Sequence, residues 1–386
     1  MTTQEKKVFS IPQVEPRNAI PQQNLRVPGP TQVPPEVMAA QAAPMINHRG
    51  PEFSAIMKRV TLRLQYFFQT EAPVFTYAAS GTGGLECAVV NVFSPGDHVV
   101  AIIIGNFGTR LAKIAQTYGL KVTRIEFPWG QAADPSVVEA RLKEVAPFKG
   151  VLMTHNETST GVTNDIQALT ARVRQVNPEA VVVVDAVSSL SSVPLEMDAW
   201  DLDVVITGSQ KGWMVPPGMM MIAVSPRAWE AHKISTLPRF YFDWSLAHKH
   251  YANWQHPATP AVSLFYALDV ALEMLLAEGR EAVFLRHAKA GQYVRERVQA
   301  MGLKLLATDP QYASNTVTAI LTPEGIDTKA FLKTLREQDR VVLAAGQDHM
   351  KGKMFRIGHI GYFKHEELVQ TLDAVEKRLH ELGFQG

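Results

Sequence analysis

The 386-residue sequence has one cysteine, Cys87, so no disulfide can form within the chain. It also has no excess of one charge, because 38 lysine and arginine residues stand against 37 aspartate and glutamate residues. Without a field of one sign, neither nucleic acid nor an anionic membrane is expected as a main partner. Long apolar runs are missing too, and a run such as "HVVAIIIG" has the length of a strand, not of a membrane span.

Neither end of the sequence carries a recognisable targeting signal. The first 24 residues contain no continuous apolar segment of the secretory type. The final "ELGFQG" is not a peroxisomal tripeptide of the SKL type. One free cysteine suits a reducing compartment, so we expect a cytoplasmic protein.

What the sequence does contain is an alternation of strand-like and helix-like segments. With 46% apolar and 19% charged residues, the chain is long enough to bury a large core in two or three domains. Short β-branched runs such as "HVVAIII" and "VVVVD" alternate with helical patterns such as "RLAKIAQTYG" and "SVVEARLKEVA". This order predicts an α/β protein with a mainly parallel sheet that is covered by helices on both faces.

Changes in composition along the chain predict three parts. Residues 1–25 are rich in proline and glutamine and are predicted to be an N-terminal arm. Residues 26–280 are predicted to form the large domain with the parallel sheet. Residues 281–386, in which runs such as "NTVTAILT" and "MFRIGHI" lie between helical segments, are predicted to form a smaller α+β domain.

In open parallel sheets, ligands bind at the carboxyl ends of the strands, where four features of this sequence are expected. The first is the glycine-rich turn in "ASGTGGLECAVVNVF", whose backbone N–H groups at Ser80, Gly81 and Thr82 open a helix and suit a phosphate. The turn has neither the Gly-Lys-Ser/Thr ending of a Walker A loop nor the GxGxxG spacing of a dinucleotide site. A purely structural turn is the simpler alternative.

The next two features are an acid and an amine. Asp185 directly follows four valines, where a carboxylate is costly to bury unless a cation or a hydrogen-bond donor meets it. Lys211 lies just past the next strand-like run, "LDVVITG", and would need a lowered pKa to act as a nucleophile or base. The structural alternatives are a helix cap for the acid and a solvated surface charge for the lysine.

The fourth feature is Arg356 in "KMFRIGHIG", where a guanidinium inside an apolar strand can bind a carboxylate through two hydrogen bonds. An ordinary ion pair is the alternative. Together, the phosphate site, an acid for a pyridinium nitrogen, an amine for an aldehyde and a guanidinium for an amino-acid carboxylate specify pyridoxal 5′-phosphate. In that interpretation Asp185 keeps the ring nitrogen protonated, while Lys211 forms a Schiff base with the aldehyde and later carries the α-proton.

Several longer motifs make a family resemblance specific. The segments "HNETSTGVTND", "DAVSSL", "MDAWDLDVVITGSQK", "YFDWSL", "SNTVTA" and "FRIGHIG" resemble the class V pyridoxal-phosphate aminotransferases, and most of all the serine-glyoxylate and alanine-glyoxylate aminotransferases. The resemblance extends from about Val27 to the C-terminus. It implies fold type I, with a large domain built on a seven-stranded type of sheet, and a homodimer whose active sites are shared between subunits.

The resemblance also implies roles for single residues around the cofactor. Residues 80–82 lie around the phosphate, Thr158 lies near the O3′ atom of the cofactor, and Gln210 precedes the Schiff-base residue Lys211. Phe107 in "GNFGTR" takes the place of a ring-stacking aromatic that is tryptophan in the alanine-glyoxylate relatives, and phenylalanine can still stack.

In "NWQHPATPAV", Thr259 matches the threonine with which the family reaches the neighbouring subunit's phosphate. His256 stands where relatives often carry an aromatic residue such as tyrosine. Its imidazole could donate to that phosphate, and a structural loop histidine is the alternative. The histidine-rich stretch "LAHKHYANWQH" has no metal-ligand spacing, so no metal is expected.

The predicted reaction is a ping-pong transfer from L-serine, which leaves as hydroxypyruvate, to glyoxylate, which leaves as glycine, with L-alanine as a further candidate donor. Alanine-glyoxylate, ureidoglycine-glyoxylate and aminoethylphosphonate-pyruvate transamination need the same lysine and acid and remain alternatives. A cysteine desulfurase is disfavoured, because Cys87 falls on an apolar helix where a buried thiol is expected. A non-enzymatic accessory protein that keeps the fold is the other alternative, although a scaffold would not need Lys211, Asp185 and Arg356 together.

Overall fold

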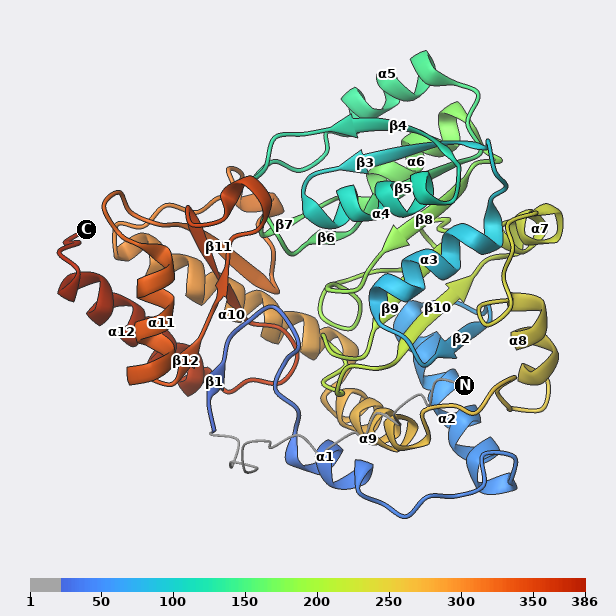
Figure 1. Cartoon of the computed structure of the whole chain (residues 1–386), viewed down its shortest axis with the longest axis horizontal. Helices are drawn as coiled ribbons and strands as arrows, with labels where there is room; N and C mark the ends of the chain where they lie inside the picture. The colour runs from blue at the N-terminus through green and yellow to red at the C-terminus, as the bar shows by residue number, and fades with distance from the viewer. Residues whose placement is uncertain (1–21) are drawn as a thin grey trace, which may run out of the picture.

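The computed structural model describes residues 22–386. Residues 1–21, which make up most of the arm predicted for residues 1–25, lie outside the described part of the chain. Figure 1 shows a large sheet with helices around it and a smaller group of strands and helices formed by the C-terminal part of the chain. The seven strands of the large sheet, in spatial order, are β2 (Val74–Tyr77), β10 (Met220–Val224), β9 (Val204–Gly208), β8 (Val181–Asp185), β5 (Gly150–Thr154), β3 (His98–Ile103) and β4 (Lys121–Glu126).

The direction of the strands confirms the prediction of a mainly parallel sheet. The pairs from β9 to β4 are parallel, and β10 is antiparallel to both of its neighbours, β2 and β9. All five residues of β8 are buried, as the run of four valines predicted. Because successive side chains of a strand point to opposite faces, Val182 and Val184 pack into one hydrophobic core and Val181 and Val183 into another.

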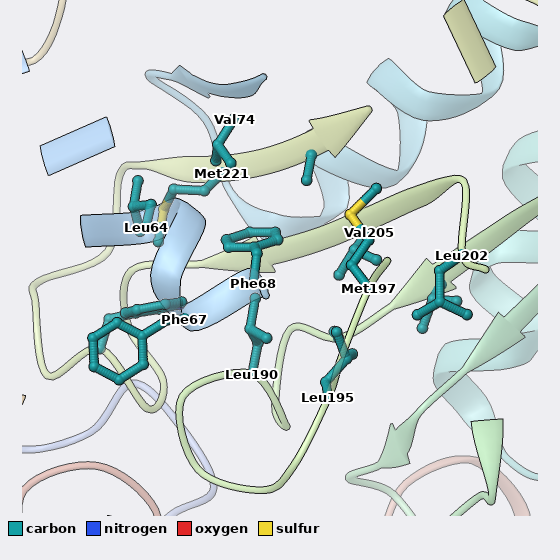
Figure 2. Packing of buried hydrophobic residues seen from close by; sticks show 14 of the residues in the cluster. Leu64, Phe67, Phe68, Val74, Leu190, Leu195, Met197, Leu202, Val205 and Met221 are labelled. Carbon is teal, nitrogen blue, oxygen red and sulfur yellow. The ribbon is translucent and has the colours of Figure 1, made fainter. Parts of the chain in front are cut away.

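Each face of the sheet is covered by its own set of helices (Figure 1). The helices on the first face are α2 (Pro51–Phe68), α5 (Pro135–Val145), α6 (Ile166–Val176) and α9 (Val262–Glu278), with α1 (Pro35–Gln41) packed on α9. The helices on the second face are α3 (Gly81–Val92), α4 (Asn106–Thr117), α7 (Pro226–Ile234) and α8 (Trp244–Tyr251). Figure 2 shows the first core where Phe68 of α2 lies among the loop residues Leu190, Leu195 and Met197.

The C-terminal part has an antiparallel three-stranded sheet in the order β11 (Val317–Leu321), β14 (Met354–Gly358), β13 (Ala344–Ala345). The helices of this part are α10 (Arg280–Ala300), α11 (Thr328–Gln338) and α12 (His365–Glu381), and the 3-10 turns are Pro310–Tyr312 and Asp348–Met350. A third hydrophobic core lies among these elements. A domain boundary near residue 280 stays a prediction.

The N-terminal residues of the described chain connect the two sheets. Strand β1 (Asn24–Leu25) pairs in parallel with β12 (Val341–Val342), and Figure 1 shows the two side by side in the C-terminal part. The backbone N–H of Gly358, at the end of β14, donates to the carbonyl of Arg26 at 2.7 Å. Five residues later, the N–H of Thr31 donates to the carbonyl of Gln210 at 3.1 Å. The segment therefore runs from β14 to the loop after β9.

No helix within residues 22–386 is both long and apolar enough to cross a membrane.

Candidate active site

The predicted acid and amine follow two adjacent strands of the large sheet. Strands β8 and β9 are parallel, and Asp185, the last residue of β8, pairs with Ile206 of β9. Strand β9 ends two residues later, and Lys211 follows in the next loop. Because the carboxyl ends of parallel strands lie at one edge of the sheet, both side chains reach the same space.

That space is a cavity of about 130 Å³. All predicted site residues except His256, Thr259 and Arg356 line it. The lining residues are Ser80, Gly81, Thr82, Leu85, Phe107, Arg110, Asn156, Thr158, Asp185, Val187, Ser188, Gln210 and Lys211.

A larger cavity of about 620 Å³ lies at the opposite ends of the strands, near Asp198, Trp229 and His248. It contains none of the predicted site residues. We assign the candidate active site to the smaller cavity, because that cavity combines a buried acid, an amine and a helix N-terminus.

The helix N-terminus at one end of the cavity belongs to α3. Ser80 is its N-cap residue, and the Ser80 side chain accepts a weak hydrogen bond of 3.4 Å from the N–H of Gly83. A side chain at Gly81 would not fit, since an added Cβ would lie 2.7 Å from a methyl group of Val187. The first N–H groups of a helix have no partner within the helix, and with the helix dipole they form a site for an anion.

Asp185 is buried without a cationic partner. Its Oδ1 accepts a 3.0 Å hydrogen bond from the N–H of Val187, and no arginine or lysine of residues 22–386 forms an ion pair with it. Burial raises the pKa of Asp185 to about 6, and the charge of Glu157 adds to the increase. A cationic nitrogen placed in this cavity would therefore be stabilised by the carboxylate.

Lys211 is partly buried at the wall of the cavity. Burial lowers the pKa of Lys211 to about 8, and the positive charge of Arg356 lowers it further, while Asp185 acts in the opposite direction. At neutral pH this amine is thus neutral far more often than a solvated lysine. The amine donates a 2.6 Å hydrogen bond to the carbonyl of Pro28.

Arg356 lies on β14 of the smaller sheet and does not itself line the cavity. It donates from Nε and Nη2 to the carbonyl of Ala345 at 3.1 and 2.8 Å, and from Nη1 to the carbonyl of Thr158 at 2.9 Å. Thr158 lines the cavity, so this bond places the guanidinium next to it. Burial lowers the pKa of Arg356 to about 10, and Glu157 partly offsets that decrease.

Phe107 lies in the first turn of α4. The carboxylate of Glu157 accepts hydrogen bonds from the N–H groups of Phe107 and Gly108 at 3.0 and 3.1 Å, which caps this helix with a buried acid. Burial nevertheless raises the pKa of Glu157. The cap fixes where the Phe107 ring lies along the cavity wall.

Three polar residues of the cavity were not predicted from the sequence: Arg110, Asn156 and Ser188. The hydroxyl of Ser188 accepts from Thr158 Oγ1 at 2.8 Å and from Asn156 Nδ2 at 2.9 Å. Helical spacing offered a signal for Arg110, because it lies one turn after Phe107 on the same helix. Ser188 follows Asp185 within "DAVSSL", but that motif does not say which of its serines turns inward.

The two residues predicted to reach a neighbouring subunit differ in their surroundings. Thr259 is exposed. His256 is buried, its Nε2 lies 2.7 Å from the carbonyl of Thr76, and its Nδ1 accepts from the N–H of Ala258 at 3.3 Å. Both ring nitrogens are thus used within the chain, which fits the structural alternative for His256.

Cys87 does not line the cavity. It is a buried free thiol on α3, and the indole Nε1 of Trp244 donates to its sulfur at 3.3 Å. Burial raises the pKa of the Cys87 thiol strongly. A buried, protonated thiol of this kind is not a nucleophile.

The chemistry of the cavity fits pyridoxal 5′-phosphate. The N-terminus of α3 suits the phosphate, the unpaired carboxylate of Asp185 suits a protonated ring nitrogen, and the amine of Lys211 suits the aldehyde. Gln210 supports the fit independently, because its buried Oε1 has no hydrogen-bond partner within residues 22–386. A side-chain amide with an unpartnered atom on the cavity wall is expected where a bound molecule supplies the missing partner.

The chain is similar to known proteins over most of its length. Residues 24–372 match the family model described as "Aminotransferase class-V". The "Soluble hydrogenase, small subunit" of a Synechococcus species is 43% identical over 93% of this chain and 94% of that protein. The L-aspartate–glyoxylate aminotransferase of Paracoccus denitrificans is 38% identical over 93% of this chain and 91% of that enzyme. The serine–glyoxylate aminotransferase of Methylorubrum extorquens is 38% identical over 94% and 92% of the two chains.

Solved structures give the same picture of the fold. The crystal structure of an alanine–glyoxylate aminotransferase from a Nostoc species superposes with a TM-score of 0.90 at 31% identity. The superposition covers 96% of this chain and all of that one. The predicted fold, an α/β architecture of the fold-type I group, is thereby confirmed.

Proposed function

The chain belongs to the class V aminotransferases, which use pyridoxal 5′-phosphate, and from this premise we propose that it transfers the amino group of L-serine to glyoxylate. The products are hydroxypyruvate and glycine. One observation carries the transaminase chemistry: a buried acid without a counter-ion and a lysine with a lowered pKa line the same small cavity. The choice of L-serine and glyoxylate rests on the similarity to the serine–glyoxylate aminotransferase. A binding protein without chemistry has no use for either costly group.

When bound, pyridoxal 5′-phosphate supplies an aldehyde that condenses with amines and a ring that accepts electrons as a proton leaves the substrate. Asp185 would hold a proton on the ring nitrogen, because its buried carboxylate accepts a backbone hydrogen bond but has no cationic partner within residues 22–386. The N–H groups at the start of α3 and the side chain of Thr82 would hold the phosphate. The ring of Phe107 would offer an aromatic face for stacking.

Lys211 is the base and acid of the reaction. With a pKa of about 8, roughly a tenth of its amine is neutral at pH 7, far more than in a solvated lysine, so that it can accept a proton and give one back. With the cofactor bound, it would take the α-proton from the substrate and deliver it to the cofactor. In the second half of the cycle it carries the proton back, so that glyoxylate leaves as glycine.

Arg356 binds the substrate carboxylate. A guanidinium has five N–H donors, and three are used by the carbonyls of Ala345 and Thr158. The two that remain, on Nη1 and Nη2, match the two oxygens of a carboxylate. Because the carbonyls hold the guanidinium plane in place, little side-chain freedom is lost on binding.

We further propose a homodimer in the cytoplasm. The exposed position of Thr259 suits a contact with the phosphate of the neighbouring subunit. The single cysteine, buried and reduced, suits a reducing compartment.

The name of the Synechococcus relative supports a second candidate, an accessory subunit of a larger redox assembly. That candidate predicts no bound cofactor or no turnover. The other relatives support L-alanine or L-aspartate as the donor in the same site.

Absorbance spectroscopy of the purified protein tests these functions. After pyridoxal 5′-phosphate is added, a cofactor band that L-serine bleaches and glyoxylate restores is expected. L-alanine, L-aspartate and aminoethylphosphonate serve as parallel donors, and the donor with the highest kcat/KM identifies the enzyme. The Lys211→Ala variant is expected to lose the covalent cofactor, and the exposed Lys233→Ala variant is the control. A protein that binds no cofactor would support the accessory subunit.

A further inference from the structure

One cation of the cavity has no part in the chemistry above. Among the residues that line it, only Arg110 and Lys211 carry a positive charge. Arg110 lies on α4, one turn after Phe107. No carboxylate of residues 22–386 forms an ion pair with Arg110.

The contacts of Arg110 point to the end of the cavity formed by α3. Its Nη1 donates a 3.2 Å hydrogen bond to the hydroxyl oxygen of Thr82, in the first turn of α3. Its Cζ lies 4.7 Å from the ring centre of Phe107, a distance at which a guanidinium and an aromatic ring attract each other. Arg110 thus bridges the helix N-terminus and the aromatic wall.

The bond to Thr82 also sets the direction of that hydroxyl. A hydroxyl has one hydrogen to donate and accepts through its oxygen. Since the oxygen accepts from Arg110, which has no acceptor of its own, the hydrogen of Thr82 must point elsewhere. An anion at the N-terminus of α3 would receive it.

The charge of a phosphate needs more than a helix end. A helix N-terminus contributes about half a positive charge, whereas a phosphate monoester carries between one and two negative charges at neutral pH. A dianion with only this compensation keeps most of its charge unpaired. A guanidinium next to the N-terminus of α3 supplies further positive charge.

We propose that Arg110 is a positioning residue for the cofactor phosphate: it compensates the charge of that group and orients the Thr82 hydroxyl as a donor. This inference rests on the proposed function, because it requires pyridoxal 5′-phosphate in the cavity. The rival role for Arg110 is binding the side-chain carboxylate of a dicarboxylic donor such as L-aspartate.

Binding of two cofactor forms to the apoprotein separates these roles. Dissociation constants are measured for pyridoxal 5′-phosphate and for pyridoxal, which lacks the phosphate. Arg110→Gln is expected to weaken binding of pyridoxal 5′-phosphate by about 10-fold to 100-fold, the range for a hydrogen bond to a charged group, and to leave pyridoxal binding unchanged. Arg110→Lys, which keeps the charge, is expected to lose less. The double variant Arg110→Gln with Thr82→Val is expected to bind pyridoxal 5′-phosphate only slightly more weakly than Arg110→Gln alone. The reason is that both changes disrupt the same pair of interacting residues.

Arg124→Gln is the matched control. Arg124 lies on the neighbouring β4, contacts Thr109 of α4 at 3.4 Å and pairs with Glu126, but does not line the cavity. It is expected to bind both cofactor forms like the wild type.

Several results would overturn the inference. An equal loss for pyridoxal would mean that Arg110 acts only through the Phe107 stack or the fold. Unchanged cofactor binding with a raised KM for L-aspartate would make it a donor-binding residue. If the wild type itself binds no pyridoxal 5′-phosphate, the proposed function fails first and the inference fails with it.

Discussion

The amine of Lys211 donates a hydrogen bond to the carbonyl of Pro28, which lies 183 residues earlier in the chain. The same N-terminal segment binds the lysine loop twice more, since the N–H of Thr31 donates to the carbonyl of Gln210 and the Thr31 hydroxyl donates to the carbonyl of Lys211. The position of the reactive amine is therefore determined by two distant segments together.

Gly29 makes this arrangement sterically possible. Its φ of +133° is one that side chains rarely adopt, and an added Cβ would lie 2.5 Å from Lys211 Nζ. We expect Gly29→Ala to slow the covalent uptake of pyridoxal 5′-phosphate by at least about 10-fold, because the amine must leave its position. The uptake is followed by absorbance. Gly325→Ala is the control, since its φ is +82° and its added Cβ would meet no atom within 4 Å. Equal behaviour of the two variants would contradict the role of the contact.

The lowered pKa of Lys211 predicts a pH dependence. Only the neutral amine reacts with an aldehyde, so the rate of cofactor uptake is expected to rise through pH about 8 and then level off. A solvated lysine would instead show a rise toward its ordinary pKa of 10.5. Stopped-flow absorbance over a pH series measures the midpoint, and a rate that still climbs above pH 10 would show that the amine is not buried in the apoprotein.

Asp185→Asn tests the acid. Without a carboxylate the ring nitrogen of the cofactor loses its proton, so proton transfer from L-serine is expected to slow by about 100-fold to 10,000-fold in a single-turnover half-reaction. The Asp185→Asn variant also lacks the titrating carboxyl group. In the apoprotein the pKa of Asp185 is about 6, above its ordinary 3.8, so its ionisation destabilises the fold as the pH rises from 3.8 to about 6. The difference in Tm between variant and wild type should therefore grow over this range. A near-normal half-reaction would make the acid merely structural.

Arg356→Ala is expected to raise KM for both L-serine and glyoxylate by about 10-fold to 100-fold, because each loses a charge-assisted pair of hydrogen bonds. A lower kcat is expected as well, since the substrate is less well oriented. Arg356→Lys keeps the charge but not the paired N–H donors of a guanidinium. Its KM values should therefore lie between those of the wild type and the alanine variant. Thermal unfolding of both variants measures how much stability is lost with the hydrogen bonds to Ala345 and Thr158. Unchanged kinetics would remove Arg356 from the site.

His256 and Thr259 should respond in opposite ways. His256→Phe loses hydrogen bonds to buried backbone groups, so the free energy of unfolding should fall by about 1–3 kcal/mol while the affinity for the cofactor stays the same. Thr259→Val should leave stability unchanged and weaken cofactor binding several-fold, provided that the residue reaches the phosphate of a neighbouring subunit. Denaturant titration and cofactor titration measure the two effects. Weaker cofactor binding in the histidine variant at unchanged stability would contradict the structural role.

Much of the site could be predicted from local sequence. Asp185 ends a run of valines and Lys211 follows the next strand, and parallel strands bring such ends to one edge regardless of the rest of the chain. The glycine-rich turn before α3 was recognisable for the same reason, because helix starts and strand ends are set by neighbouring residues. These chemical types at these local positions led to one cofactor.

Other features depend on segments that are far apart in sequence, and no local pattern contains them. Arg356 meets the carbonyl of Thr158 across 198 residues. For His256 the sequence left a phosphate donor and a structural loop histidine open, and the fold places its two nitrogens against backbone groups of its own chain.

The sequence by itself determined the sheet, the helix whose N-terminus suits an anion and the identity of the candidate reactive groups, since these follow from hydrophobic periodicity and from residue chemistry. Only the tertiary structure decided where Pro28 meets Lys211 and where Arg110 meets Thr82. The physical reason is that such contacts are set by how whole elements pack, and close packing selects one arrangement from many that the same local pattern allows.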